Sequence, residues 1–279
     1  MRARGDRKPM RDEAIRIGGQ SGTDRERRNL LREYLQHVLL RLLFEARLLG
    51  ELVFHGGTAL RILHDLARFS EDLDFHTGAA VSGFDLADKV DELTARIESN
   101  GYRVETKLRP EGNVQSCMFR FPNLLHDCDL SNRAEEKLRV RLEVDRNPPA
   151  GFATERSAVD RFFPFVIVHH DRATFVAGKL HAILQRPFAK GRDFYDLGFY
   201  LRRWPELVPN LEYLNAALRQ TGYEGEEATA ANWKDLVAGR LREADWAAIE
   251  RDLAPFVLRS GDLEAFEREF LLRLLLGTG

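Results

Sequence analysis

Residues 52–75 read LVFHGGTALRILHDLARFSEDLDF, and this stretch decides the fold. Its first four residues predict a short buried strand that ends at Gly56 and Gly57, where two glycines allow the backbone to turn sharply. Thr58 is then expected to cap a short amphipathic helix. The alternation of residues 69–76 predicts a second strand. We therefore expect this stretch to fold as strand, helix and strand.

Amphipathic helices and alternating strands extend outward from this unit in both directions. Before and after it, the helical period predicts helices over residues 24–49, with Thr23 or Asp24 as cap, and over residues 84–100. Further strands are predicted over residues 102–108, 114–121, 138–146 and 162–168, and further helices over residues 174–186, 193–204, 209–220, 231–256 and 262–275. The order of elements predicts an α+β fold, a mixed sheet with flanking helices followed by a helical C-terminal domain.

Three segments are expected along the chain. Residues 1–22 are rich in arginine and show no sustained period, so we expect a mobile basic N-terminus. Residues 23–170 would form the core that carries the sheet. Residues 171–279 would form the helical C-terminal domain.

The composition is that of a globular protein with a sizeable core. Of the 279 residues, 44% are hydrophobic and 31% are charged, which excludes a disordered or collagen-like chain. The richest apolar stretch, residues 39–54, is interrupted by charged residues and excludes a membrane span. Cys117 and Cys128 form no CxxC pair and are expected to stay reduced, as in the cytoplasm. The net charge of -2 argues against a broad coating of nucleic acid but permits a local basic groove.

The first cluster of polar and glycine residues lies where the first strand meets its helix. Gly56 and Gly57 would let the backbone approach a bound group, and a helix that begins at Thr58 would offer amide groups and a positive dipole end to a phosphate. Arg61, one turn into the helix, would add a fixed cation. The alternative is an ordinary strand-to-helix turn with a threonine cap.

The second cluster is a pair of carboxylates on the second strand. Asp72 and Asp74 are two residues apart, so both side chains project from one face of the strand, roughly 6–7 Å apart at the backbone. Two like charges held this way favour a cation between them, and hard oxygen ligands suit Mg²⁺. The alternative is a half-exposed strand whose polar face happens to be acidic.

A third carboxylate from a neighbouring strand would complete a metal site. Glu143 is favoured because apolar residues flank it on both sides, but Asp145 lies on the same face of that strand and stays open as the alternative. Two divalent ions about 4 Å apart, bridged by acidic groups, stabilise the attacking and leaving oxygens of a phosphoryl displacement.

The third cluster lies in the helical half of the chain. Lys179 would neutralise a triphosphate as a point charge, and Arg186 or Arg192 would pair with phosphate oxygens. Asp193 and Asp196 share one face of the next helix. The alternative is an Asp–Arg network that ties two helices together.

These clusters carry a resemblance to a known family. The sequence resembles the AbiEii-type nucleotidyltransferases, the toxins of abortive-infection and related toxin–antitoxin systems that include the mycobacterial MenT toxins. The resemblance extends over roughly residues 30 to 200, and its four blocks are residues 55–61, residues 68–75, Lys179 and residues 192–196.

The resemblance implies the DNA-polymerase-β-like nucleotidyltransferase fold, with residues 23–170 as its core. It also implies a nucleoside triphosphate bound with Mg²⁺ or Mn²⁺, a bacterial cytoplasmic setting and a cognate antitoxin encoded nearby. Some relatives attach nucleotides to the acceptor end of tRNA and so halt translation.

The family's functional residues map onto this sequence by their motifs. By resemblance, Gly56, Gly57 and Thr58 would hold the triphosphate, and Lys179 would lie at its phosphates. Asp72 and Asp74 match the metal-binding pair, and Glu143 fits the pattern of the third carboxylate. Asp196 matches the final acidic residue, with Arg192 and Asp193 beside it.

We therefore expect an enzyme that transfers NMP from an NTP to RNA, at the 3′ end of tRNA, and releases pyrophosphate. Arg139, Arg141, Arg146 and the arginine-rich N-terminus are expected to guide the RNA backbone. Two alternatives stay open. One is nucleotidyl or phosphoryl transfer to a protein or small molecule, and the other is a non-catalytic subunit that binds a nucleotide or RNA.

Overall fold

The computed structural model describes residues 10–257 and 266–277. The chain divides into two compact units, each built from several segments. The sheet unit comprises the chain up to Phe54 and residues 70–147 and 156–168, and the helical unit comprises residues 55–69, 148–155 and 169 onward. The predicted boundary at residue 170 falls between the last strand and the helix that follows it. The helix after the first strand, however, groups with the helical unit.

The sheet has seven strands in the order β3-β4-β5-β2-β1-β7-β6. It is mixed, because β2 runs parallel to β5 whereas β4 runs antiparallel to both β3 and β5. The strands are β1 (Leu52–His55), β2 (Asp72–Thr77), β3 (Glu105–Arg109), β4 (Val114–Phe121), β5 (Leu138–Asp145), β6 (Thr154–Val159) and β7 (Phe165–His170). All of them except β6 were predicted from the sequence; β6 is mostly exposed and has no apolar alternation to mark it.

The helices of the sheet unit are α1 (Met10–Gly18), α2 (Asp24–Glu45), α4 (Ala87–Ser99) and the short α5 (Leu124–Asp127). Two of them, α1 and α5, were not predicted from the sequence. The α2 helix begins with a capping box between Thr23 and Glu26, as the cap residue predicted. It ends at Glu45, earlier than predicted, and a 3₁₀ turn over Leu48–Gly50 follows.

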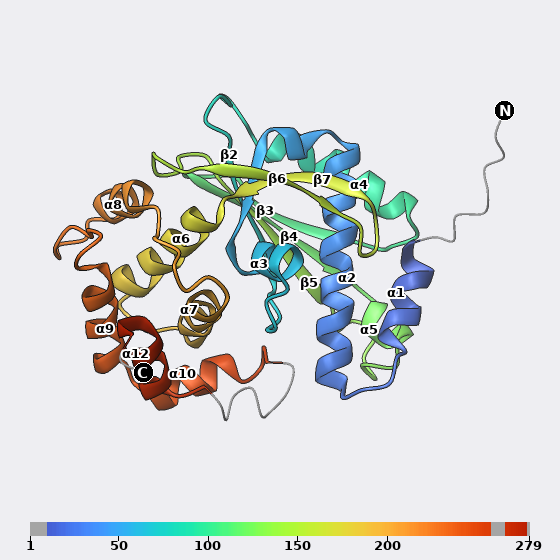
Figure 1. Cartoon of the computed structure of the whole chain (residues 1–279). Helices are drawn as coiled ribbons and strands as arrows, with labels where there is room; N and C mark the ends of the chain where they lie inside the picture. Colours follow the sequence, from blue (N-terminus) through green and yellow to red (C-terminus); the bar gives the residue numbers. More distant parts are fainter. Residues whose placement is uncertain (1–9, 258–265, 278–279) are drawn as a thin grey trace. The chain divides into compact units, whose positions relative to one another are not determined.

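The expectation of a mobile N-terminus is wrong for the described part of residues 1–22. From residue 10 the chain forms α1, which packs along α2 (Figure 1). Ala14 and Ile17 are buried, and the hydroxyls of Tyr34 and Tyr102 both donate to the carbonyl of Met10. Burial of this apolar edge stabilises a helix that its charged sequence does not reveal. Residues 1–9 lie outside the described residues.

The helical unit is built around α6, which packs against α7, α8 and α9. Its helices are α3 (Gly56–His64), α6 (Arg172–Gln185), α7 (Gly191–Arg203), α8 (Leu211–Gln220), α9 (Trp233–Glu243), α10 (Trp246–Leu253) and α12 (Arg268–Leu276). The predicted helix over residues 231–256 is two helices, because Ala244 is extended and Asp245 caps α10 through the amide of Ala248. Part of the predicted helix over residues 262–275 lies outside the described residues.

The α+β fold class is confirmed, with a mixed sheet, flanking helices and a helical second half of the chain. In the sheet unit, Phe54 of β1 stacks on Phe75 of β2 with ring centroids 4.8 Å apart. Leu73 and Phe75 are buried, so the alternate residues of β2 present the opposite face. None of the described helices combines the length and the apolarity needed to cross a bilayer.

Candidate active site

Strands β2 and β5 bring the predicted carboxylates together on one face of the sheet. The parallel register pairs Asp72 with Arg141 and Asp74 with Glu143. Residues paired in register on adjacent strands point to the same face, and residues two apart along a strand do so as well. Asp72, Asp74 and Glu143 therefore form one carboxylate cluster, with Arg141 on the same face.

Arg141 holds two members of the carboxylate cluster. Its Nε and Nη2 donate to the two oxygens of Asp72 at 3.2 and 2.7 Å, and its Nη1 lies 3.2 Å from Oε1 of Glu143. Paired charge-assisted bonds of this kind are stronger than bonds between neutral groups. In this arrangement carboxylates engage the guanidinium of Arg141, and its expected role in guiding RNA stays a prediction.

The electrostatics of the cluster suit a cation. Burial raises the pKa of Glu143, and the negative charges of Asp74 and Asp72 raise it further, whereas Arg141 lowers it. The side chains of Asp72 and Glu143 are only 27% and 29% exposed, so solvent screens their repulsion incompletely. A carboxylate that is desolvated beside like charges is stabilised by a bound cation.

Asp145, the alternative third carboxylate, lies elsewhere in the register. It is paired with His76, beyond the Asp74–Glu143 pair, and its Oδ1 accepts a hydrogen bond from the amide of Asn147 at 2.8 Å. Asp145 thus stabilises the turn that follows β5. The register favours Glu143 as the neighbour of Asp74.

The donor set of the carboxylate cluster fits a hard divalent cation, since Mg²⁺ prefers carboxylate oxygens. Over residues 10–257 and 266–277, however, no three His, Cys, Asp or Glu side chains are gathered closely enough to hold an ion. The bonds to Arg141 account for the positions of Asp72 and Glu143.

The diglycine turn opens α3 directly. Gly56 adopts φ +77°, which a residue with a side chain rarely adopts, so glycine is needed where the chain leaves β1. The helix begins at Gly56, and its N-cap residue, His55, makes no side-chain capping bond. The prediction that Thr58 caps the helix is wrong, because Thr58 lies buried inside the first turn. The first turn of α3 therefore contains both glycines and Thr58.

Arg61 has a structural role in the helical unit. Its Nη1 donates to the carbonyls of Leu66 and Ala67 at 3.0 and 3.2 Å, and its guanidinium lies 4.1 Å from the ring centroid of Phe69. These contacts fix the loop after α3. The prediction that Arg61 supplies a cation to phosphate is not supported by this geometry, because the loop engages its guanidinium.

Lys179 lies between two carboxylates of α7. Its Nζ is 3.0 Å from Oδ1 of Asp193 and 2.7 Å from Oδ2 of Asp196. Arg186 holds the other oxygen of Asp193 at 2.5 Å. Arg68 donates from Nε and Nη2 to both oxygens of Asp196, at 2.7 and 2.6 Å. The Asp–Arg network that the sequence left as an alternative therefore exists, and it includes Lys179.

This network carries an excess of positive charge, since three cations surround two carboxylates. Burial acts to raise the pKa of Asp193, but Lys179 and Arg186 outweigh it and hold that pKa below its usual value. Asp193 is therefore ionised, and it fixes the ammonium of Lys179 together with Asp196. Arg68 begins one of the four blocks of the family resemblance, but the sequence assigned it no role, and in the structure it is only 2% exposed.

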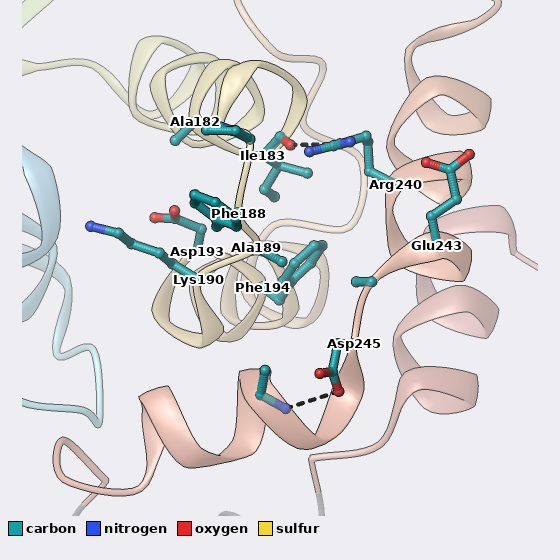
Figure 2. Close-up of a pocket in the computed structure, with 13 residues that line it drawn as sticks. Ala182, Ile183, Phe188, Ala189, Lys190, Asp193, Phe194, Arg240, Glu243 and Asp245 are labelled. Carbon is teal, nitrogen blue, oxygen red and sulfur yellow. Dashed lines mark hydrogen bonds between the residues drawn. The ribbon is translucent and has the colours of Figure 1, made fainter.

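Two further features of the helical unit involve α7: the contact of Arg192 and a cavity. The guanidinium of Arg192 lies 4.3 Å from the ring centroid of Phe256. A cavity of about 290 Å³ has Asp193 in its wall, with Phe188, Phe194 and Arg240 among its other lining residues (Figure 2). This cavity could not be predicted from the sequence, because its walls come from four separate helices and the segments that join them.

Comparison with known proteins identifies the family. A sequence model described as the nucleotidyl transferase AbiEii toxin of type IV toxin–antitoxin systems matches residues 37–268. No curated protein matches the chain. Among solved structures, JHP933 from Helicobacter pylori is 18% identical, with 88% of each chain covered and a TM-score of 0.52. The nucleotidyltransferase toxin MenT4 from Mycobacterium tuberculosis is 20% identical, with 95% of this chain and 98% of that chain covered and a TM-score of 0.47.

The family match extends over most of the chain and includes every motif that carried the resemblance. The likeness to JHP933 bears on the fold and agrees with the predicted α+β architecture. Both the predicted family and the predicted enzyme class are confirmed. The chain belongs to the AbiEii nucleotidyltransferase toxin family of type IV toxin–antitoxin systems.

Proposed function

We propose that this protein transfers NMP from an NTP to a hydroxyl of RNA, at the 3′ end of tRNA, and that the modification blocks translation. The observation that carries the proposal is the register of β2 and β5, which sets Asp72, Asp74 and Glu143 on one face. Pyrophosphate leaves as the new phosphodiester bond forms. The reaction requires charge neutralisation and positioning more than covalent chemistry by the protein.

In the sheet unit, Asp72, Asp74 and Glu143 would hold Mg²⁺ or Mn²⁺. The ion supplies charge neutralisation at the phosphates. Glu143 would also accept the proton of the attacking RNA hydroxyl, since the raised pKa of its carboxylate makes it a stronger base.

In the helical unit, the first turn of α3 and Lys179 would bind phosphate. Gly56 and Gly57 leave room for a phosphate to approach the amides of a helix N-terminus, and Thr58 lies in the same turn. Asp193 and Asp196 hold the ammonium of Lys179 at a fixed position, which removes the entropy cost of ordering a long side chain upon binding. Arg192 on α7 would add positive charge.

The family membership implies a cognate antitoxin. We propose that it is encoded nearby and that the toxin acts in the cytoplasm, where NTP and tRNA are available. Expression in a bacterial host should arrest growth without the neighbouring gene and permit growth with it.

Labelled nucleotides test the reaction. The protein is incubated with total tRNA, Mg²⁺ and each of the four NTPs, labelled at either the α- or the γ-phosphate. We expect one or more α-labelled NTPs to label tRNA and no γ-labelled NTP to do so. Periodate-oxidised tRNA, which lacks the 3′ diol, and EDTA serve as controls and should each abolish labelling.

The same experiment distinguishes the alternatives. Transfer of the γ-label indicates phosphoryl transfer, and an α-label on protein or on a small molecule indicates another acceptor. NTP binding without transfer to any acceptor indicates a non-catalytic subunit. Each of these results contradicts the proposal.

A further inference from the structure

Arg141 differs from an ordinary surface arginine because it contacts two carboxylates of the cluster at once. It lies in register with Asp72 on the neighbouring strand and two residues before Glu143 on its own strand, so it faces both carboxylates. Its bonds to them bridge β2 and β5. A guanidinium has five donors in a rigid fork, which suits it to holding more than one carboxylate oxygen.

The cluster needs such a cation. Asp72, Asp74 and Glu143 repel one another on a partly buried face, and an ion pair there gains more than a fully exposed one. Arg32 of α2 adds positive charge nearby, with its Nη1 3.6 Å from Glu71. Arg141 is in direct contact with two of the proposed metal ligands, and its side chain is 39% exposed, so it can swing into solvent.

We propose that Arg141 is the resident counter-ion of the carboxylate cluster and that a divalent ion displaces it. The proposal rests on the proposed function, because it takes the cluster as the metal site. The guanidinium and the ion compete for the same oxygens of Asp72 and Glu143. Arg141 therefore keeps the metal-free sheet stable and at the same time weakens metal binding.

Mn²⁺ titration of the full chain, with free Mn²⁺ followed by electron paramagnetic resonance, tests this competition without measuring activity. We expect Arg141→Ala to bind Mn²⁺ about tenfold more tightly than the wild type, because no guanidinium has to leave. Arg141→Lys should lie between the two, since an ammonium remains but cannot fork onto both oxygens. Arg139→Ala is the matched control, because Arg139 lies two residues earlier on the same face of β5 and is exposed. It should leave the Kd unchanged.

Thermal unfolding gives a second readout. Without metal, Arg141→Ala should unfold at a lower temperature than wild type, and saturating Mn²⁺ should raise its midpoint by more than it raises that of the wild type. If Arg141→Ala does not fold, the thermal unfolding curve will show no transition. Mn²⁺ binding by Arg141→Lys is then compared with that of the wild type.

The Asp72→Asn variant separates the two proposals. If it abolishes Mn²⁺ binding while Arg141→Ala and Arg141→Lys bind no more tightly than wild type, the counter-ion proposal is overturned and the metal site stands. If Asp72→Asn binds Mn²⁺ as the wild type does, the ion lies elsewhere, and both proposals are overturned.

Discussion

At the scale of single residues, Arg68 and Asp196 form the most deeply buried ion pair described, with 2% and 0% of their side chains exposed. We expect Arg68→Ala to lower the free energy of unfolding by about 3–5 kcal/mol, because it leaves a buried carboxylate short of a partner. Urea denaturation measures the loss. Arg242→Ala, at an exposed position of α9, is the control and should change stability little. A loss below about 1 kcal/mol for Arg68→Ala would mean that Lys179 alone suffices for Asp196.

His64 gives the stability of the helical unit a pH dependence. Its pKa is lowered to about 4, mainly by burial and to a smaller extent by electrostatic interactions with His169, Arg172 and Arg203, whereas Asp65 opposes the shift. Its ring packs edge-on against Trp204, with centroids 5.0 Å apart. Between about pH 6.5 and pH 4 the unfolded chain binds the proton and the folded chain does not. The stabilising contribution is therefore complete above about pH 6.5 and is lost as the pH falls towards 4.

The variant His64→Phe removes this titration and keeps an aromatic ring against Trp204. We expect its melting temperature to fall less between pH 7 and pH 4.5 than that of the wild type, as measured by circular dichroism. His126→Phe, at an exposed histidine, should keep the wild-type slope. Equal slopes for His64→Phe and wild type would assign the acid sensitivity to other groups.

At the scale of elements, two glycines on helices of the same unit have opposite surroundings. A Cβ on Gly191, the first residue of α7, would lie 2.1 Å from the carbonyl oxygen of Ile249 in α10. A Cβ on Gly239, inside α9, would meet nothing within 4 Å. The first glycine permits close packing of two helices, whereas the second only weakens its own helix.

These surroundings predict opposite effects of alanine. Gly191→Ala should destabilise the protein by about 1–3 kcal/mol, because α7 and α10 must move apart. Gly239→Ala should stabilise it by up to about 1 kcal/mol through helix propensity. Urea denaturation of both variants checks the signs, and a neutral Gly191→Ala would show that α10 can shift freely.

At the scale of the whole molecule, local sequence patterns predicted most helices and strands. They did not predict the elements that depend on contacts with distant parts of the chain. Alternation located β5, and the cap at Thr23 located α2, because both signals are contained in a few adjacent residues. Strand β6 was missed because its pairing, and not its own polar sequence, makes it a strand. α1 was missed because its apolar edge is stabilised by α2 and by two tyrosines.

The same distinction applies to the candidate site. The spacing of Asp72 and Asp74 places both on one face, so the sequence alone predicts that pair. The apolar flanks of Glu143 already favoured it over Asp145, and the register of β2 against β5 adds that Glu143 is the residue paired with Asp74. The contacts of three arginines, Arg141, Arg61 and Arg68, could not be predicted, because no helix or strand period relates each arginine to all its partners. Arg141 and Arg61 contact protein groups in place of the RNA and phosphate that the sequence suggested, and Arg68 is buried in an ion pair.

The central claim is that Asp72, Asp74 and Glu143 are the metal ligands of a nucleotidyl transfer to RNA. The most direct test is the rate of α-label transfer to tRNA by Asp72→Asn, Asp74→Asn and Glu143→Gln, with Asp145→Asn as the matched control and circular dichroism to confirm folding. We expect each of the first three to lose activity by at least about a hundredfold and Asp145→Asn to retain it. Wild-type rates in Asp72→Asn and Glu143→Gln, or loss of transfer in Asp145→Asn alone, would contradict the claim.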